Sequence, residues 1–214
     1  MRPYTVEGLD CSGKKTITRL VQERLQEQGL RTNIVIGPLI GGGLGRLDAR
    51  LASITTAVRR GSPTDLLRRS LYVAEPVLDR LFHRPGPTPV LKVSTHFRAW
   101  ARAGVEHDRW MAGGYNATRS VHVRYAGATL LATDFDVRLA RHRADVAAGR
   151  TTKVEHRRFF GPDPEAFTAW HDALDRLMSA HIPHVLRLDS TTTDPADLAE
   201  RIALHAATCW EADR

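Results

Sequence analysis

The stretch from residue 4 to residue 27 constrains the fold more than any other part of the chain. A short apolar run at 4–7 leads into Gly8-Leu9-Asp10-Cys11-Ser12-Gly13-Lys14, and a segment of helical character follows at 14–27. Gly8, Gly13 and Lys14 have the spacing G-x-x-x-x-G-K. Between a strand and a helix, a loop of this kind points backbone N–H groups at phosphate oxygens, and the helix N-terminus adds partial positive charge. The sequence therefore predicts a strand, a phosphate-binding loop and a helix.

The residue after Lys14 departs from the usual pattern. Lys14 is expected to reach the β- and γ-phosphates, and a Ser or Thr normally follows it to bind Mg²⁺. Here Lys15 follows, and the hydroxyl of Thr16 comes one place late, which makes Thr16 the candidate metal ligand. Two interpretations of Lys15 remain open. In the first, its ammonium group occupies space near the usual Mg²⁺ position and partly replaces the metal. In the second, the side chain points to solvent, and either the metal or all catalysis is lost. The predicted nucleotide-binding residues are Gly8, Cys11, Ser12, Gly13, Lys14, Lys15 and Thr16.

Beyond this loop, short strands alternate with helical segments. The predicted strands are 4–7, 32–36, 89–94, 126–132 and 184–188. Such alternation is typical of an α/β fold in which a five-stranded parallel sheet has helices on both faces. The first loop then lies at the carboxyl edge of the sheet, where open α/β sheets bind ligands. No linker or repeat divides residues 1–214, so we expect a single domain.

Two further segments are rich in glycine or arginine. Gly41-Gly42-Gly43-Leu44-Gly45 leads into a helical pattern at 46–59, and is either a mobile loop beside the nucleotide site or a simple linker. A predicted helix at 134–148 is followed by an exposed basic loop at 149–161.

Charge and composition narrow the partners. The net charge is +7, which suits nucleic acid, an acidic membrane surface or phosphorylated small molecules. No run of five like charges and no basic face with interleaved aromatics occurs, so a nucleic-acid partner is not expected. No apolar run is long enough to cross a membrane, and no signal peptide precedes the first strand. The two cysteines, Cys11 and Cys209, form no metal-ligand pattern. We expect a cytoplasmic protein without a membrane partner.

The order and spacing of these pieces resemble the thymidylate kinase family of P-loop nucleoside monophosphate kinases. Residues 6–10, 12–14 and Thr16 resemble its opening motif, E-G-x-D-G-x-G-K-S-T. Leu44-Gly45 resembles the end of its second conserved stretch, and 130–141 its fourth strand, followed by an Arg-rich lid. Residues 186–190 and 194–202 resemble its final strand, adenine-side turn and helix. The resemblance spans essentially the whole chain. It implies a P-loop kinase-like fold with a lid at about 142–160, ATP with Mg²⁺ as cofactors, and a homodimer.

Several family positions are changed together. Cys11 and Lys15 replace a glycine and the Mg²⁺-binding serine, and the family's R-E-P appears as Ile36-Gly37-Pro38. Its substrate-phosphate arginine aligns with Pro76, and its D-R pair with Val93-Ser94. These departures argue against a functional thymidylate kinase. They predict an acceptor other than dTMP, namely a nucleoside, another nucleotide or a specialised metabolite.

The candidate catalytic residues are Lys14, Lys15, Asp10 and Arg143. Asp10 either orients a phosphate-binding arginine or a metal-bound water, or supplies negative charge at a helix N-terminus. Arg141 resembles the lid-side arginine that stacks on adenine, or else it lies on a solvated helix face. The other candidate lid arginines are Arg143, Arg150, Arg157 and Arg158.

Four residues are candidates for the acceptor site. His96 and Arg98 follow the third strand, and His96 is either a base or a structural histidine. Tyr72 and Phe97 either stack on an aromatic acceptor or belong to the core. The sequence predicts an ATP-dependent phosphotransferase that moves a phosphoryl group to a small-molecule acceptor. The alternative is a catalytically silent P-loop fold that acts as a nucleotide-binding or assembly module.

Overall fold

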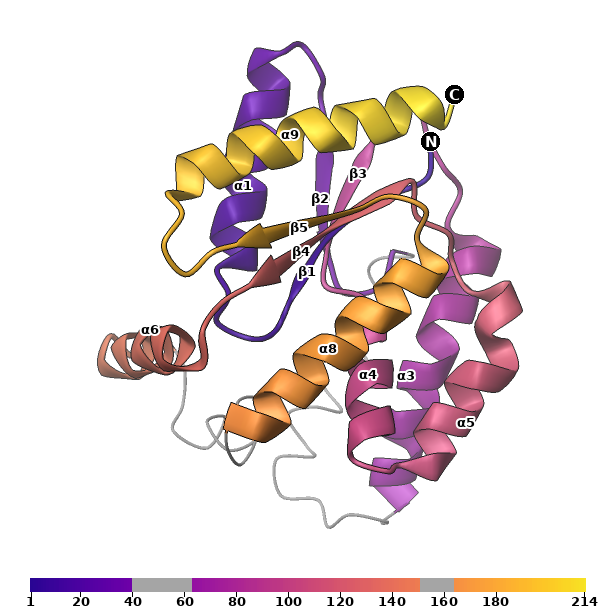
Figure 1. Ribbon diagram of the computed structural model, residues 1–214. Coiled ribbons are helices and arrows are strands. Elements are labelled where there is room, and N and C mark those ends of the chain that lie inside the picture. The colour runs from indigo at the N-terminus through magenta and orange to yellow at the C-terminus, as the bar shows by residue number, and fades with distance from the viewer. Residues whose placement is uncertain (40–62, 151–163) are drawn as a thin grey trace.

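A five-stranded parallel sheet forms the centre of the molecule. The computed structural model describes residues 1–39, 63–150 and 164–214. The strands are β1 (Tyr4–Gly8), β2 (Asn33–Ile36), β3 (Val90–Val93), β4 (Gly127–Ala132) and β5 (Val185–Asp189). All four strand pairs are parallel, in the order β2-β3-β1-β4-β5 (Figure 1). The α/β fold with an all-parallel sheet is thus confirmed, and each strand lies within two residues of its predicted bounds.

The described α-helices are α1 (Lys14–Glu27), α3 (Pro63–Phe82), α4 (His96–Val105), α5 (Arg109–Thr118), α6 (Phe135–Ala147), α8 (Pro164–His181) and α9 (Pro195–Ala212). Side-chain oxygens cap the starts of α4, α5 and α9; at α9, Asp194 accepts a hydrogen bond from Ala196 N (2.7 Å). Thr95 accepts a hydrogen bond from Phe97 N (3.3 Å) at the start of α4, and Asp108 accepts one from Met111 N (3.1 Å) at the start of α5.

Part of the predicted lid, and the predicted loop at 41–45 with the helical pattern after it, lie outside the described residues. Residues 142–147, where the predicted lid begins, form the last turns of α6, in agreement with the helix predicted at 134–148. Arg157, Arg158 and the segment 41–59 lie outside the described residues.

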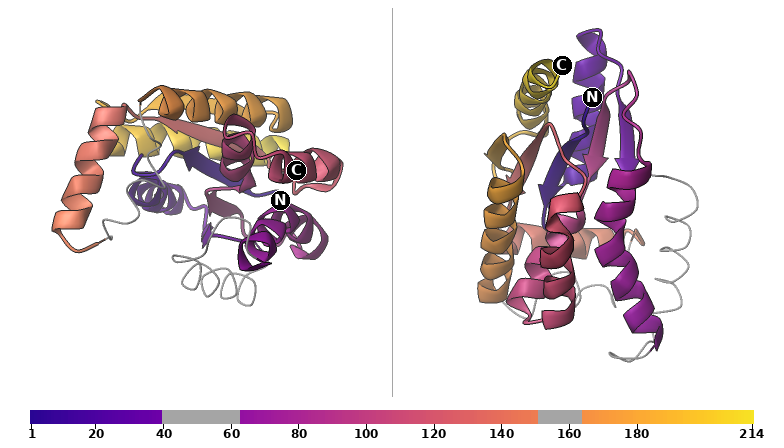
Figure 2. Two further views of the ribbon diagram at one scale, coloured as in Figure 1. Left: turned by 90° about the horizontal axis from the view of Figure 1, so that it is seen from below. Right: turned by 90° about the vertical axis from the view of Figure 1, so that its right-hand side faces the viewer.

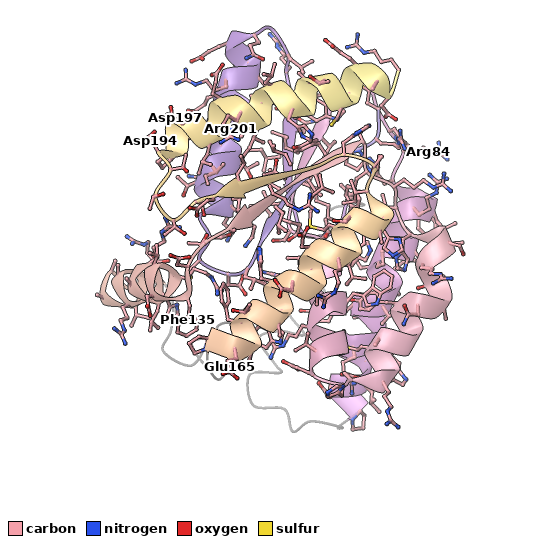
Figure 3. All side chains as sticks on the ribbon, viewed as in Figure 1. Arg84, Phe135, Glu165, Asp194, Asp197 and Arg201 are labelled. Atoms are coloured by element: carbon pink, nitrogen blue, oxygen red, sulfur yellow. The ribbon has the colours of Figure 1, made fainter. Side chains whose placement is uncertain are left out.

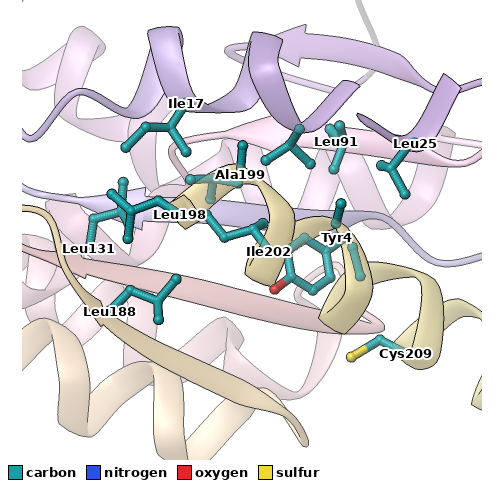
Figure 4. Packing of buried hydrophobic residues seen from close by; sticks show 14 of the residues in the cluster. Tyr4, Ile17, Leu25, Leu91, Leu131, Leu188, Leu198, Ala199, Ile202 and Cys209 are labelled. Atoms are coloured by element: carbon teal, nitrogen blue, oxygen red, sulfur yellow. The ribbon is translucent and has the colours of Figure 1, made fainter. Parts of the chain in front are cut away.

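Two hydrophobic cores lie on opposite faces of the sheet, because successive strand side chains alternate in direction. On one face, Tyr4 and Val6 of β1 pack against α1 and α9 (Figure 4). On the other, Ala128 and Leu130 of β4 pack against α4, α5 and α8. Figure 2 shows α3, α4, α5 and α8 side by side, extending past the carboxyl ends of the strands. These four helices therefore wall the space beyond that edge.

The strand order sets where a ligand could enter. After β1 the chain continues to β2, which lies on one side of β1 in the sheet. After β3 the chain crosses to β4, which lies on the other side of β1. A crevice therefore opens beyond the carboxyl ends of β1 and β3, the position where open α/β sheets bind ligands. The loops that follow these two strands, 9–13 and 94–95, both lie there.

Gly127 of β4 packs closely against α9, and we expect Gly127→Ala to lower the free energy of unfolding by about 1–3 kcal/mol. A Cβ at this position would lie 2.5 Å from Cys209 Sγ and 3.1 Å from Tyr4 Cε2. Chemical denaturation would measure the loss, and Cys209→Ala in the same chain should restore part of it by removing the sulfur. The matched control is Gly104→Ala in α4, where nothing lies within 4 Å. A Gly127→Ala protein as stable as this control would contradict the packing argument.

Candidate functional site

The loop between β1 and α1 has a backbone that few residues other than glycine can adopt. Gly8 has φ +152°, and a Cβ on it would lie 2.8 Å from the carbonyl oxygen of Leu131. Gly13, directly before α1, has φ +83°. Cys11 has φ 61° although it carries a side chain. Strained backbone of this kind concentrates at functional sites, and both glycines of the spacing that defined the loop are required by its shape.

Lys14 folds back over this loop. Its ammonium group donates hydrogen bonds to the carbonyl oxygens of Gly8 and Leu9, both at 2.7 Å, and lies 3.5 Å from Ser12 Oγ. The residue is only 7% exposed. Burial lowers the pKa of Lys14 to about 8, and the nearby charge of Arg98 adds to the effect. The loop therefore holds a buried cation at the cleft described below.

Lys15 and Thr16 lie at the rim of the same site. Both side chains are exposed and both line the cleft. Thr18, one turn further into α1, is buried and donates its hydroxyl to the carbonyl oxygen of Lys14 (2.7 Å). The exposed ammonium of Lys15 and hydroxyl of Thr16 thus remain available to groups in the cleft.

Asp10 connects the loop to α4. Its carboxylate forms an ion pair with Arg98, and its carbonyl oxygen accepts a hydrogen bond from Arg138 Nε of α6 (2.5 Å). Burial would raise the pKa of Asp10, but the charges of Arg98, Lys14 and Arg138 outweigh it and lower the pKa. The interpretation in which Asp10 orients an arginine therefore agrees with the geometry.

Glu7, at the end of β1, is fully buried beneath the loop. One carboxylate oxygen accepts a hydrogen bond from the backbone N–H of Thr95, and the other from Gly8 N (3.3 Å). Burial raises the pKa of Glu7, while Arg98 and Lys14 oppose the increase. This carboxylate joins the β1 loop to the turn after β3.

Arg141 of α6 bridges the loop and the turn after β5. Its guanidinium donates to Ser190 O at 2.8 Å and to Cys11 O at 3.5 Å. Ser190 in turn donates its hydroxyl to Ser12 O (3.2 Å). Figure 3 shows the starts of α6 and α9, at Phe135 and Asp194, on the same side of the molecule. Arg143 is exposed on α6 and is not among the described residues that line the cleft.

The acceptor candidates separate into two groups. Tyr72, His96 and Arg98 line the cleft. Phe97 instead is buried, with its ring centroid 6.2 Å from those of Trp100 and Tyr125, so the interpretation of Phe97 as a core residue agrees with its position. The cleft is also lined by charged residues outside the four acceptor candidates, among them Asp65, Arg69, Glu75, Arg102, Glu106 and Asp108. The i, i+4 spacing of Arg98 and Arg102 in α4 and of Glu106 at its C-cap was the available signal in the sequence.

These groups surround one continuous cleft of about 1740 Å³. It extends from the turn at 190–195, past the loop after β1, to α3, α4 and α5. Small-molecule pockets are usually about 300–1,000 Å³, so this cleft has room for two ligands at once. Two residues that line the cleft have a left-handed backbone: Cys11, with φ 61°, and Ser94 directly after β3, with φ 64°. After the two binding sites that the sequence predicts, we call the side near Arg141 and 191–195 the donor half, and the side formed by α3, α4 and α5 the acceptor half.

Behind the acceptor half, three histidines pack in an aromatic cluster, and we expect the protein to lose stability as the pH falls below about 6.5. The His96 and His122 ring centroids are 4.6 Å apart, and the His181 and Trp100 centroids are 5.1 Å apart. Burial lowers the pKa of His122 to about 4 and holds the pKa of His96 well below its usual value. Because the unfolded chain binds these protons first, stability is present above pH 6.5 and is lost as the pH falls towards 4.

Urea denaturation between pH 7 and pH 4.5 would measure this dependence. Other groups titrate in the same window, so the informative quantity is the difference between the wild type and His122→Gln, whose slope against pH should be shallower. His184 is exposed, and His184→Gln is the control that should keep the wild-type slope. Equal slopes for all three proteins would contradict a role for the cluster.

Among residues 1–39, 63–150 and 164–214, no group of three or more His, Cys, Asp or Glu side chains is arranged to hold a metal ion. Over the same residues, no helix is long and apolar enough to span a membrane. No protein-family model matches the chain, and a search of curated proteins finds no match.

Proposed function

We propose that this protein is a divergent P-loop phosphotransferase, resembling the thymidylate kinase family, that moves a phosphoryl group from ATP to a small-molecule acceptor other than dTMP. The observation that carries the proposal is the position of Lys14. A buried ammonium held by two loop carbonyls, at the start of a helix that faces a large cleft, suits the phosphates of a nucleotide. The Lys14 ammonium has three N–H donors, and the two backbone carbonyls use two of them. A bound phosphate could therefore accept the third without displacing either carbonyl.

The described residues fit a nucleotide in the donor half. The triphosphate would lie on the N-terminus of α1, with Lys14 and Arg141 as its cationic partners. ATP supplies the transferable phosphoryl group. The protein's own contribution is to position the reactants and neutralise charge, which is the main requirement of phosphoryl transfer. The adenine would lie toward the turn at 191–195, which lines the cleft beside Arg141.

Mg²⁺ is part of the proposal in a modified form. The hydroxyl of Thr16 lines the cleft and would bind the metal or one of its waters. Lys15, in the position of the usual serine, would add a single positive charge near the phosphates. A monovalent ammonium cannot bridge β- and γ-oxygens as a divalent ion does, so turnover slower than that of ordinary kinases is expected.

Binding and turnover can be measured separately. Thermal shift and titration calorimetry with ATP, with and without Mg²⁺, report nucleotide binding, which should raise the unfolding midpoint by mass action. ATP consumption is then followed with a panel of nucleosides, nucleotides and small alcohols. Binding with acceptor-dependent ATP consumption supports the proposal. Absence of both, with Mg²⁺ present, would refute it.

The second candidate is a catalytically silent nucleotide-binding or assembly module. It is favoured by the exposed ammonium of Lys15 where the resemblance implies a metal-binding hydroxyl. Lys15→Ser distinguishes the two candidates. Acceptor-dependent turnover in the wild type favours the phosphotransferase, and a faster Lys15→Ser variant would show that Lys15 restrains it. ATP binding without turnover in either protein favours the silent module.

A further inference from the structure

We propose that the acceptor half binds a compound that presents an un-ionised hydroxyl group, and not a phosphate monoester, and that Asp10 takes the proton of that hydroxyl. The inference rests on the proposed function and narrows its acceptor class. It comes from how the arginines of the acceptor half are paired.

Each described arginine that lines the acceptor half has a carboxylate partner within the cleft. Arg69 forms an ion pair with Asp108, and Arg102 pairs with Glu106 at 2.5 Å. Arg98, at the boundary with the donor half, pairs with Asp10. Proteins usually recognise a phosphate monoester through the paired N–H donors of an arginine guanidinium. A carboxylate binds the same donors, so it competes with the phosphate for them.

Binding of a phosphate in this half would therefore be unfavourable for two reasons. To reach Arg69 or Arg102 it must displace Asp108 or Glu106, and the displaced carboxylate then remains beside another anion. Asp65, which also lies 3.8 Å from Arg69, adds to the negative charge at that point. A neutral acceptor would leave these ion pairs in place. Tyr72, Met111 and Trp170 line the same cleft and offer apolar surface to such a compound.

The change of acceptor class alters the chemistry required. A phosphate oxygen is already an anion and attacks without a base, whereas an alcohol must lose a proton as it reacts. The acceptor oxygen forms a bond to the γ-phosphorus while the bond from that phosphorus to the β–γ bridging oxygen breaks. The bridging oxygen leaves with the electron pair on the diphosphate, and the hydroxyl proton passes to the Asp10 carboxylate. An aspartate has this task in protein kinases.

Asp10 is placed for this role. It belongs to the loop that holds Lys14, and its side chain pairs with Arg98 of α4 at the boundary between the two halves. The charges of Arg98 and Lys14 keep the carboxylate ionised, and so able to accept a proton, at neutral pH. His96 also lines the cleft, but its buried ring is packed against Phe97 and His122, and Asp10 is more open to an acceptor.

Calorimetry on the full chain, saturated with a non-hydrolysable ATP analogue, tests the acceptor class. The probes are inorganic phosphate and matched pairs: thymidine and dTMP, uridine and UMP, glycerol and glycerol 3-phosphate. The wild type should not bind the phosphorylated member of any pair more tightly than its hydroxyl counterpart. The double variant Asp108→Asn/Glu106→Gln removes the carboxylate closest to Arg69 and the carboxylate paired with Arg102, and keeps an amide cap on α5. It should bind phosphate about tenfold more tightly or better.

A matched control removes two carboxylates from arginine pairs outside the cleft. Asp175 pairs with Arg187, and Glu200 lies 3.8 Å from Arg24. Asp175→Asn/Glu200→Gln makes the same change in net charge and should leave phosphate binding at the wild-type level. Tighter wild-type binding of a monophosphate than of its nucleoside, or equal phosphate binding by the two double variants, overturns the assignment of acceptor class.

The role of Asp10 has its own readout. Asp10→Asn should lower turnover of a hydroxyl acceptor by about 10²-fold and leave the affinity for the ATP analogue within about threefold. A parallel loss of analogue affinity and turnover would instead assign Asp10 to the donor half. If the wild type fails to bind the analogue at all, the proposed function fails. If it binds the analogue and prefers monophosphates, only this inference fails.

Discussion

Replacing Lys14 by methionine is expected to lower the affinity for ATP and any turnover by about 10²–10³-fold, the usual effect of removing one preorganised donor from a site that stabilises negative charge. Methionine matches the length of the lysine stem, so the fold should remain. Burying an ammonium is costly, and only part of that cost is offset by the contacts with Gly8 O and Leu9 O. The free energy of unfolding should therefore change by no more than about 1 kcal/mol. Calorimetry with ATP and chemical denaturation measure the two effects.

The neighbouring lysine provides the control. Lys15→Met removes the same charge from an exposed side chain of the same helix turn, and it should weaken ATP binding much less than Lys14→Met. The pH dependence adds a second check. Because the pKa of Lys14 is about 8, binding an anion above that pH must take up a proton, so wild-type affinity should fall as the pH rises through 8. Similar ATP affinity in the Lys14→Met and Lys15→Met proteins would exclude the central role of Lys14.

The second large effect is on stability: Lys92→Met should lower the free energy of unfolding by about 3–5 kcal/mol. Lys92 of β3 is 1% exposed and its ammonium lies 2.8 Å from Asp79, which is 0% exposed. Asp79 also accepts a hydrogen bond from Leu39 N (2.7 Å), so its carboxylate joins α3, β3 and the segment 37–39 that follows β2. Removing the lysine leaves a buried carboxylate without its closest cation.

A double variant separates the charge from the packing. Lys92→Met/Asp79→Leu removes both charges and should recover most of the loss, because an apolar pair often replaces a buried ion pair at little cost. The exposed pair Arg187–Asp175 gives the comparison, and Arg187→Met should cost at most about 1 kcal/mol. Urea denaturation of the four proteins tests the expectation. A Lys92→Met protein no less stable than Arg187→Met would mean that water solvates the buried carboxylate.

Much of the local structure could be predicted from the sequence. The parallel sheet could be predicted because apolar runs alternate with segments of helical periodicity. Both patterns can be recognised within a short stretch of sequence. The need for glycine at positions 8 and 13 followed from their spacing before Lys14. The helix predicted at 134–148 is observed as α6. The bounds of α5 were less predictable, because the apolar pattern is weak there and only the Asp108 cap marks its start.

The partners of the site residues were decided by the tertiary structure alone. Asp10 and Arg98 are 88 residues apart, and no periodicity relates them. They meet because β3 lies next to β1 in the sheet, which also brings Thr95 to Glu7. The sequence alone determined that a glycine-rich loop with a lysine begins the first helix. The order of the strands decided which charges surround that lysine, since contacts across a sheet depend on crossover connections that local patterns do not encode.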